Sequence, residues 1–104
     1  MILKSKTLSL DDERKQVLSG GKEIKMTRSS FLMLQALMLA NGRVLSKDQL
    51  LEAVCGVPVE RSPNCTGVGI YILRRSLGKK CRFLVETVRG FGFKYPEPVS
   101  KHNK

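Results

Sequence analysis

The first quarter of the chain alternates short apolar and charged stretches. Over residues 1–26 these stretches are separated by polar turns at 11–12 and 19–21, the second of which carries two glycines. Short alternating stretches between turns of this kind are typical of antiparallel strands that present one face to a core. The pattern therefore predicts a small antiparallel meander at the N-terminus.

A dense apolar segment comes next and predicts the first helix. Residues 31–39 are apolar except for Gln35, and most of them are unbranched residues that favour helices. Thr27 is a residue type that caps helix N-termini, and Asn41 with Gly42 suits the left-handed turn that closes a helix. Because apolar side chains cover nearly every face, we expect this helix to be buried against both a sheet and other helices.

A capping motif marks the start of a second helix. Ser46 and Gln49 have the S-x-x-Q spacing, in which the serine side chain caps the amide three residues on and the glutamine reaches back. The apolar stripe that follows is Leu50, Leu51 and Val54. Gly56 is expected to end this helix. The two prolines within residues 57–63 predict a loop, because each restricts itself and the residue before it.

A third helix and a hairpin complete the pattern. The inward face of the helix is predicted from positions spaced by four, three and four residues: Thr66, Ile70, Leu73 and Leu77. Two β-prone runs, 83–88 and 93–95, flank a basic tip with two glycines, which predicts a β-hairpin. After Pro96 the chain shows no apolar periodicity, so we expect one domain over residues 1–96 and a disordered tail over 97–104.

The order of these elements predicts the architecture of the domain. A short sheet, a buried helix, a capped second helix, a loop, a basic third helix and a basic hairpin follow one another. Two helices joined by a short connection, the second of them basic on one side, describe a helix-turn-helix, and the hairpin beside it would be a wing. We therefore expect an α+β fold, a winged helix-turn-helix with a three-helix core, an N-terminal antiparallel sheet and a C-terminal β-hairpin wing.

Charge separates the two parts of the chain. The 104 residues carry 19 Lys and Arg against 9 acids, a formal charge of +10. Residues 1–60 have a net charge of +2, and residues 61–104 have a net charge of +8. A positive field concentrated on one part of a small domain attracts phosphate. The C-terminal part is therefore expected to face a polyanionic partner, and a helix with a wing can hold the major and minor grooves of DNA together.

Composition and residue spacing argue against other classes of protein. The three cysteines, Cys55, Cys65 and Cys81, lack C-x-x-C spacing and are expected to be packing residues. His102 is the only histidine, so we expect neither a metal site nor nucleophilic catalysis, and no cofactor. The longest apolar run is too short to span a bilayer, and no signal-peptide core is visible. We predict a cytoplasmic, non-enzymatic protein that does not contact a membrane.

Three stretches resemble the OmpR/PhoB-type winged-helix effector domains of response regulators in bacterial two-component systems. They are residues 42–46 with 49–51, residues 73–77, and residues 87–93, which read TVRGFGF. Each stretch alone is a weak signal, but together they stand in the family's order and at compatible spacing. The resemblance covers about residues 7–95. It implies sequence-selective binding of double-stranded DNA by a transcription regulator.

The resemblance also implies roles for particular residues. The third helix would read the major groove, and Arg89 at the wing would enter the minor groove. Together with the exposed positions of that helix, the expected DNA-binding residues are Lys47, Asn64, Val68, Tyr71, Ile72, Arg74, Arg75, Thr87 and Arg89. The loop that corresponds to the family's contact with RNA polymerase is Val57, Pro58, Val59, Glu60 and Arg61. A homodimer on repeated half-sites is implied as well, normally driven by a receiver domain that is absent from these residues.

The third helix departs from the family pattern. Asn64, Gly67 and Gly69 stand in its leading half, where Arg, Asp and His are usual. Two glycines are expected to loosen the first turns, unless DNA binding orders them or the duplex approaches the backbone closely. Ile72 replaces a residue that is often Arg, so its contact would be apolar, to a thymine methyl group.

A second hypothesis follows from these departures. The chain would then be a protein-interaction module that keeps the winged-helix scaffold and has weak or no DNA specificity. Its contact surface would be the apolar side chains of Val68, Tyr71 and Ile72. RNA binding lacks support, because no aromatic residues are arranged to stack single-stranded bases.

Overall fold

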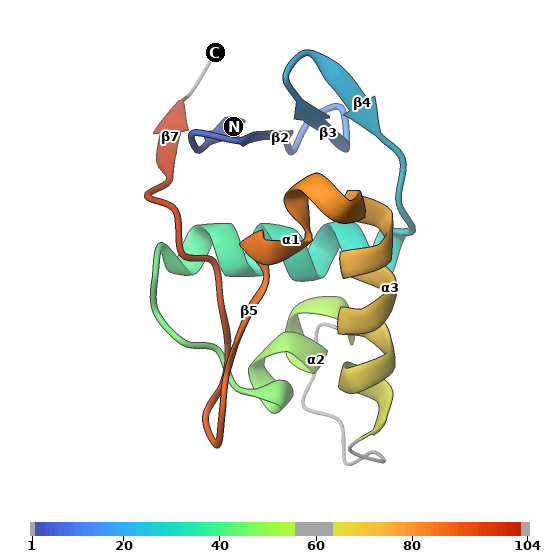
Figure 1. The fold of residues 1–104 in the computed structure, drawn as a ribbon, viewed down its shortest axis with the longest axis vertical. Coiled ribbons are helices and arrows are strands. Elements are labelled where there is room, and N and C mark those ends of the chain that lie inside the picture. The colour runs from blue at the N-terminus through green and yellow to red at the C-terminus, as the bar shows by residue number, and fades with distance from the viewer. Residues whose placement is uncertain (1, 56–63, 103–104) are drawn as a thin grey trace.

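The structure, a computed structural model, describes residues 2–55 and 64–102, apart from the side chains of Cys55, residues 64–68 and Lys80. Its elements are β1 (Ile2–Lys4), β2 (Leu8–Asp11), β3 (Gln16–Ser19), β4 (Lys22–Ile24), α1 (Arg28–Ala40), α2 (Lys47–Cys55), α3 (Asn64–Cys81), the 3-10 helix η1 (Arg82–Leu84), β5 (Glu86–Val88), β6 (Gly92–Lys94) and β7 (Ser100–His102). This part of the chain contains the predicted three-helix core, N-terminal sheet and C-terminal hairpin, so the α+β winged-helix fold is confirmed (Figure 1). None of its helices has the length and apolar character needed to cross a membrane.

The antiparallel sheet closes one end of the domain. Among the described residues its strands run in the order β4-β3-β2-β1-β7. Leu10 lies opposite Leu3 on one side and opposite Val17 on the other, and all three side chains are buried. Alternation along the strands thus places one apolar face toward α1, which runs below the sheet in Figure 1. The predicted N-terminal meander is confirmed.

The end of the chain joins this sheet as β7. Strand β7 pairs antiparallel with β1, with Ser100 opposite Lys4. The expectation of a domain that ends at residue 96 and a disordered tail over 97–104 is therefore wrong as far as His102. The side chains of β7 are exposed and show no apolar periodicity. Backbone hydrogen bonds to β1 order this strand. Because nearly every residue type can form such bonds, the sequence of β7 shows no apolar pattern that would predict the strand.

Glu97 ties the segment before β7 to the sheet. Its carboxylate accepts hydrogen bonds from Thr7, at 3.0 Å from the backbone nitrogen and 2.6 Å from the hydroxyl Oγ1. Partial burial opposes ionisation of this carboxyl, but the hydrogen bonds from Thr7 and Ser5 outweigh it and hold the pKa of Glu97 below its usual range. The ionised carboxylate is therefore part of the fold.

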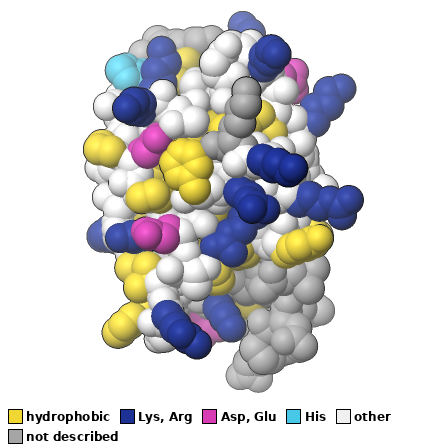
Figure 2. Space-filling view, in the orientation of Figure 1, with side chains coloured by type: hydrophobic (Ala, Val, Ile, Leu, Met, Phe, Trp, Pro, Cys, Tyr) yellow, Lys and Arg dark blue, Asp and Glu magenta, His cyan; other side chains and the backbone are white. Residues whose placement is uncertain are grey.

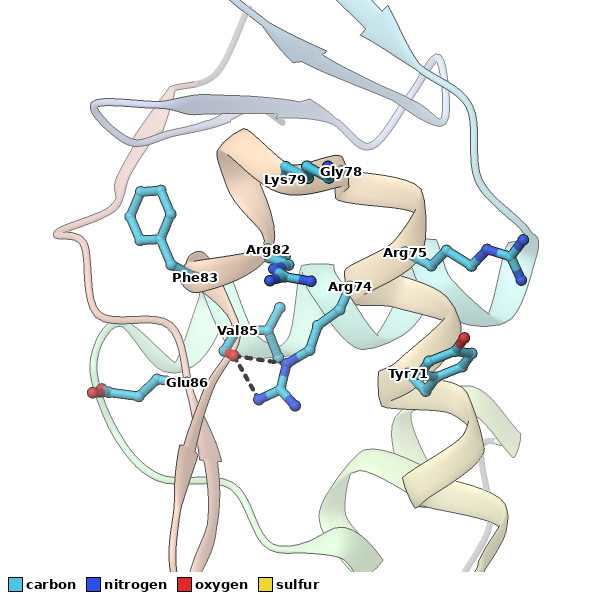
Figure 3. Close-up of a pocket in the computed structure, with 9 residues that line it drawn as sticks. All are labelled: Tyr71, Arg74, Arg75, Gly78, Lys79, Arg82, Phe83, Val85 and Glu86. Carbon is cyan, nitrogen blue, oxygen red and sulfur yellow. Dashed lines mark hydrogen bonds between the residues drawn. The ribbon is translucent and has the colours of Figure 1, made fainter.

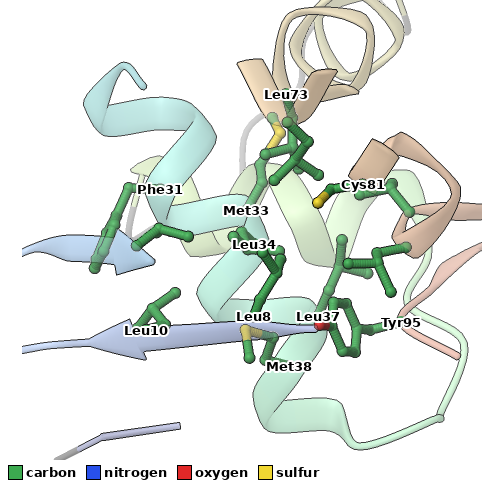
Figure 4. Close-up of a cluster of buried hydrophobic side chains, with 14 of the residues drawn as sticks. Leu8, Leu10, Phe31, Met33, Leu34, Leu37, Met38, Leu73, Cys81 and Tyr95 are labelled. Atoms are coloured by element: carbon green, nitrogen blue, oxygen red, sulfur yellow. The ribbon is translucent and has the colours of Figure 1, made fainter. Parts of the chain in front are cut away.

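Helix α1 lies at the centre of the core. Its N-cap is Thr27, whose side-chain oxygen accepts from the Ser30 backbone nitrogen at 3.2 Å, and its C-cap Asn41 is left-handed with a φ of 49°. Both caps are as predicted. Leu34 and Leu37 are completely buried, and Figure 4 shows the side chains of α1 packed between residues of the sheet and of α3. The expected burial against a sheet and other helices is confirmed.

The capping motif of α2 forms as predicted. The Ser46 backbone nitrogen donates to Gln49 Oε1 at 2.8 Å, and the Gln49 backbone nitrogen donates to Ser46 Oγ at 3.2 Å. Leu50 of the predicted stripe is completely buried. Helix α2 ends at Cys55. Residues 56–63, which include the helix stop and the loop expected to contact RNA polymerase, lie outside the described residues.

Helix α3 carries the predicted inward stripe and changes direction near its end. Ile70, Leu73 and Leu77 of the stripe are buried. Gly78 has a φ of 79° and a ψ of 178°, which is not helical, so the chain leaves the axis of α3 at this residue. A positive φ of this size favours glycine. The residues after Gly78 therefore turn across the top of α3 toward the hairpin, as Figure 1 shows.

The segment between α3 and the hairpin differs from its prediction. Residues 82–84 form the 3-10 helix η1, and the first strand of the hairpin begins at Glu86. The expectation of a strand that starts at Phe83 is therefore wrong. Leu84 and Val85 are adjacent and both buried, whereas successive side chains of a strand point to opposite faces. The 3-10 turn ends at Leu84, and Val85 follows it in an extended conformation.

Candidate nucleic-acid interface

The C-terminal hairpin is the predicted wing, and backbone hydrogen bonds anchor it next to α2. Strands β5 and β6 pair antiparallel, with Thr87 opposite Phe93. Leu45, just before α2, extends this ladder. Its backbone nitrogen donates to the Phe93 carbonyl at 2.7 Å, and its carbonyl accepts from the Phe93 nitrogen at 2.9 Å. The base of the wing is therefore fixed against the start of α2.

Two glycines of the wing serve different purposes. Gly92 has a φ of 147°, and a Cβ built on it would collide with the Leu45 carbonyl oxygen and lie 2.8 Å from the carbonyl carbon. Gly90, at the tip, has a φ of 85° and open space around the same position. Gly90 therefore permits the turn, whereas Gly92 also makes room for the chain before α2.

Arg74 joins α3 to the wing. Its Nε and Nη2 donate to the Val85 carbonyl at 3.1 and 2.7 Å, and Nη2 also donates to Thr87 Oγ1 at 2.6 Å. The guanidinium carbon lies 5.9 Å from the centre of the Phe93 ring. Figure 3 shows the side chain reaching from the helix to the strand. Arg74 and Thr87, both expected at a DNA interface, thus contact each other and link the helix to the wing.

The outer side of α3 carries other residues expected to read DNA. Tyr71 is 63% exposed and Ile72 is 38% exposed, and Arg75 is exposed as well. These positions face away from the buried stripe, as predicted. Asn64 and Val68 lie in the first turns of α3, and their side chains are outside the described part of the structure.

A groove of about 520 Å³ is lined by the wing and by the start of α2. Lys47 from α2 and Arg89 from the wing both line it, and both side chains are exposed. The residue expected at a phosphate and the residue expected in the minor groove therefore border one groove.

Gly69 is explained by packing inside the protein. A Cβ at this position would lie 3.1 Å from the Met33 sulfur and closer still to its terminal methyl group. Met33, on α1, is buried in the core (Figure 4). The missing side chain therefore faces α1 and not the outer side of α3. The expectation that the two glycines loosen the first turns of α3 stays a prediction.

A larger basic groove lies between α3, η1 and β5 (Figure 3). Its volume is about 810 Å³. The charged residues that line it are Arg74, Arg75, Lys79, Arg82 and Glu86. Figure 2 shows Lys and Arg side chains gathered in the middle of the face over this region. Lys79 and Arg82 were not among the residues expected from the sequence, although the charge excess after residue 61 was a signal for them.

The predictions about cysteines and metal sites can be compared with the structure only for the side chains that it describes. Cys81 is buried in the core, and its sulfur lies 3.5 Å from Ser19 Oγ, so its expected packing role is confirmed. The side chains of Cys55 and Cys65 are outside the described part. Among the side chains that are described, no three His, Cys, Asp or Glu residues lie close enough together to hold a metal ion.

Comparison with known proteins places this geometry among regulators of transcription. Residues 21–95 match a family model described as transcriptional regulatory protein, C terminal. The transcriptional regulatory protein CutR of Streptomyces coelicolor is 32% identical over 93 residues, which cover 89% of this chain and 42% of CutR. The response regulator protein PmrA of Pseudomonas aeruginosa is 32% identical over 92 residues, which cover 88% of this chain and 40% of PmrA. The chain thus spans about two fifths of the length of these relatives.

Solved structures show the same fold. The DNA-binding domain of RstA from Klebsiella pneumoniae, in complex with the RstA box, superposes with a TM-score of 0.80 at 26% identity and covers 91% of this chain and 96% of that one. The DNA-binding domain of CpxR from E. coli superposes with a TM-score of 0.80 at 25% identity and covers 94% of this chain and 98% of that one.

Proposed function

This chain belongs to the C-terminal transcriptional regulatory protein family, the OmpR/PhoB-type winged-helix effector domains of response regulators, and on this premise we propose how it binds double-stranded DNA. As a member of that family it is a DNA-binding domain of a transcription regulator. In our proposal α3 lies in the major groove, and the wing places Arg89 in the adjacent minor groove. The two elements select a sequence together.

The observation that carries this proposal is the contact between Arg74 of α3 and Thr87 of β5 at 2.6 Å. A helix in one groove and a finger in the next must keep a fixed separation, because the grooves of a duplex have a fixed repeat. The Arg74 guanidinium bonds to Val85, just before β5, and to Thr87 within it, and in our proposal these bonds fix that separation. The backbone pairing of Leu45 with Phe93 supports the other side of the wing.

Each exposed residue has a task in this arrangement. Tyr71 and Ile72 lie on the outer side of α3 and contact base edges, with Ile72 suited to a thymine methyl group. Arg75, one turn further along, and Lys47, at the start of α2, neutralise phosphates. Arg89 extends from the wing into the minor groove, where a cation is favoured.

Further parts of the proposal rest on the family resemblance. The domain binds as a homodimer to repeated half-sites, driven by a receiver domain where one is attached, and residues 57–61 contact RNA polymerase. It works in the cytoplasm, where bacterial DNA lies. The family is not an enzyme class, and in our proposal the domain binds without catalysing a reaction.

Selection of bound duplexes from a random library, followed by fluorescence anisotropy, tests the proposal. Arg89→Ala is expected to weaken binding to the selected duplex by about 1 to 3 kcal/mol, because one minor-groove cation is lost. Arg14→Ala, which removes an exposed arginine from the turn between β2 and β3, is the matched control. If about six phosphates are neutralised, the logarithm of affinity should fall with the logarithm of salt concentration at a slope of roughly −5.

The same measurement separates the two hypotheses. Binding of the selected duplex in preference to random DNA, with sensitivity to Arg89, supports the DNA-reading domain. If the protein binds neither the selected nor the random duplex at low salt, the proposal is wrong and a protein-interaction module on the same scaffold is favoured.

A further inference from the structure

We propose that the groove between α3, η1 and β5 holds the sugar-phosphate strand that separates the two DNA grooves, with Arg82 and Lys79 as its phosphate contacts. This inference rests on the proposed function, and it adds two binding residues and a path for the backbone.

The position of the groove follows from the geometry of a duplex. One sugar-phosphate strand separates a major groove from the minor groove beside it. If α3 occupies the first and Arg89 enters the second, that strand has to cross the surface between α3 and the wing. The groove of about 810 Å³ lies between α3 and β5, the first strand of the wing. It is therefore on the path of the backbone.

The charges that line the groove suit a phosphate. Arg75, Lys79 and Arg82 are exposed, and none of them forms an ion pair with another residue that the structure describes. Glu86 is the acid in the lining, and its carboxylate lies 3.4 Å from the Lys94 ammonium on the neighbouring strand. The groove thus collects positive charge that the described residues leave without a counter-charge.

Arg74 and Arg82 contribute in different ways. Figure 3 shows both side chains in the space between α3 and β5. The Arg74 donors point to Val85 and Thr87, so this residue contributes its charge and fixes the groove wall. No hydrogen bond joins Arg82 to another described residue through its side chain, so its guanidinium donors are available to phosphate oxygens.

The turn at Gly78 brings the contact residues into place. A continuous helix would carry Lys79 and the residues after it further along the axis of α3. The non-helical Gly78 instead turns the chain across the end of α3 and into η1, so that Lys79 and Arg82 line the groove with Phe83. Phe83 is 58% exposed and presents an apolar edge beside these cations, which suits the sugar faces of the same strand.

The experiment compares single charge-removing variants of the same chain. Arg82→Gln and Lys79→Gln remove proposed phosphate contacts, and Lys22→Gln removes an exposed cation from β4 at the sheet end. Thermal denaturation checks that all three remain folded, which we expect because the side chains are exposed. Affinity for the selected duplex is then measured from about 50 to 200 mM salt, the range over which phosphate contacts change affinity strongly.

Each lost phosphate contact is expected to reduce the slope of log affinity against log salt concentration by about 0.9. Between about 50 and 200 mM salt, the variant should then lose about 3.5-fold less affinity than the wild type. Arg82→Gln and Lys79→Gln should show this change, and Lys22→Gln should show less than half of it. Duplexes with one neutral methylphosphonate locate the contact. The wild-type protein should bind the duplex less tightly when the neutral group lies between the major-groove and minor-groove sites. Arg82→Gln should bind that duplex and the unmodified duplex with equal affinity, because it has already lost the contact.

The outcomes separate this inference from the proposed function. In one outcome the wild-type protein binds the selected duplex, but the Arg82 and Lys79 variants have the same salt dependence as Lys22→Gln and the same response to methylphosphonates as the wild type. The groove then holds no phosphate, and only this inference is wrong. If the wild-type protein binds no duplex at all, the proposed function itself is wrong.

Discussion

The two ends of this domain are held together by different kinds of contact. At the sheet end, apolar side chains from several strands and from α1 share one core, and Leu3, Leu10 and Leu37 are completely buried in it. At the other end, α3 and the base of the wing also contribute buried side chains, among them Leu73 and Phe93, but hydrogen bonds position the rest of the wing. Arg74 of α3 donates to Thr87, and Leu45 pairs with Phe93 through the backbone. Apolar packing is non-directional and spread over many contacts, so it sets stability. A few directional bonds set position.

The two ends also differ in the ion pairs that their charged side chains form. Near the sheet, Lys15 pairs with Asp12 at 3.1 Å, and Arg14 lies 4.0 Å from Asp11. Around the groove beside α3, Arg75 and Arg82 have no ion pair with a described residue. Exposed cations lie at both ends, and in our proposal those beside α3 contact the DNA. The comparison teaches that stability and DNA binding in this domain should respond to different substitutions.

Removal of core volume is expected to give the largest effect on stability. Leu37→Ala leaves a cavity at a completely buried position, so the free energy of unfolding should fall by about 2 to 5 kcal/mol. The Kd of the molecules that remain folded should not change, because Leu37 is completely buried and is not among the proposed DNA contacts. Urea denaturation and anisotropy at low temperature measure the two quantities.

Leu39→Ala is the matched control for this core substitution, because Leu39 lies on the same helix and is 37% exposed. It should lower stability far less. Equal losses for the two leucines, or a weaker Kd for folded Leu37→Ala, would show that the two ends of the domain are not separable.

Gly92→Ala is expected to lower both the stability of the domain and its affinity for DNA. The new Cβ would collide with the Leu45 carbonyl, so the backbone bridge to Phe93 has to break and the wing has to move. Strain at a positive φ adds about 1 to 3 kcal/mol, so stability should fall by about that amount or more. DNA affinity should fall by about 1 to 3 kcal/mol, the value of the contact that Arg89 loses.

Gly90→Ala separates backbone strain from this collision. Gly90 has a positive φ of 85° but open space around the added methyl group, so the cost should stay near 1 kcal/mol. DNA affinity should change less than in Gly92→Ala. The explanation from the Leu45 contact would be wrong if both alanine variants lost stability and affinity equally.

Arg74→Lys tests the junction alone, because it keeps the charge and removes the planar fork that bonds to Val85 and Thr87. We expect DNA affinity to fall by about 1 to 2 kcal/mol, while the salt dependence stays close to that of the wild type. Arg75→Lys is the control, because Arg75 is an exposed neighbour and the substitution also keeps the positive charge. It should lower DNA affinity less than Arg74→Lys.

A double-variant cycle shows how Arg74 acts. In an Arg89→Ala background, Arg74→Lys should weaken DNA binding less than it does in the wild type, because the wing no longer has a minor-groove contact to position. Fully additive losses would mean that Arg74 does not act through the wing.

The smallest expected effect is a pH dependence at the sheet end. The pKa of Glu97 is held below its usual range by the hydrogen bonds from Thr7 and Ser5, so its contribution to stability is complete above the ordinary pKa of 4.5 and is lost as the pH falls through the lowered value. Wild-type Tm should therefore drop more on acidification than the Tm of Glu97→Gln. Glu52→Gln, an exposed carboxylate of α2, is the control and should keep the wild-type slope.

The parts of the fold that the sequence predicted depend on residues close together in the chain. Thr27 caps α1 through an amide three residues away, and Ser46 with Gln49 caps α2 over the same distance. The spacing of Ile70 and Leu73 places both on the buried side of α3. Such contacts leave a local pattern because one short segment contains both partners.

The errors lie where a residue's partner is distant in sequence. Strand β7 pairs with β1, at the opposite end of the chain, and its exposed side chains give no sign of that. Nothing in the sequence indicated that Gly69 lies against Met33 of another helix. The β-prone run over 83–88 predicted a strand from Phe83, whereas residues 82–84 form η1 and the strand begins at Glu86.

The sequence by itself determined the order of the N-terminal meander, the three helices and the hairpin, the caps of the first two helices, the wing with its arginine and the family to which the chain belongs. Residue types and spacings over short segments are enough to specify these properties. Only the tertiary structure decided that Arg74 spans helix and wing, that Gly92 makes room for Leu45, and that Lys79 and Arg82 share a groove. These facts depend on the distance between segments far apart in the chain, and that distance is set by packing of the whole core.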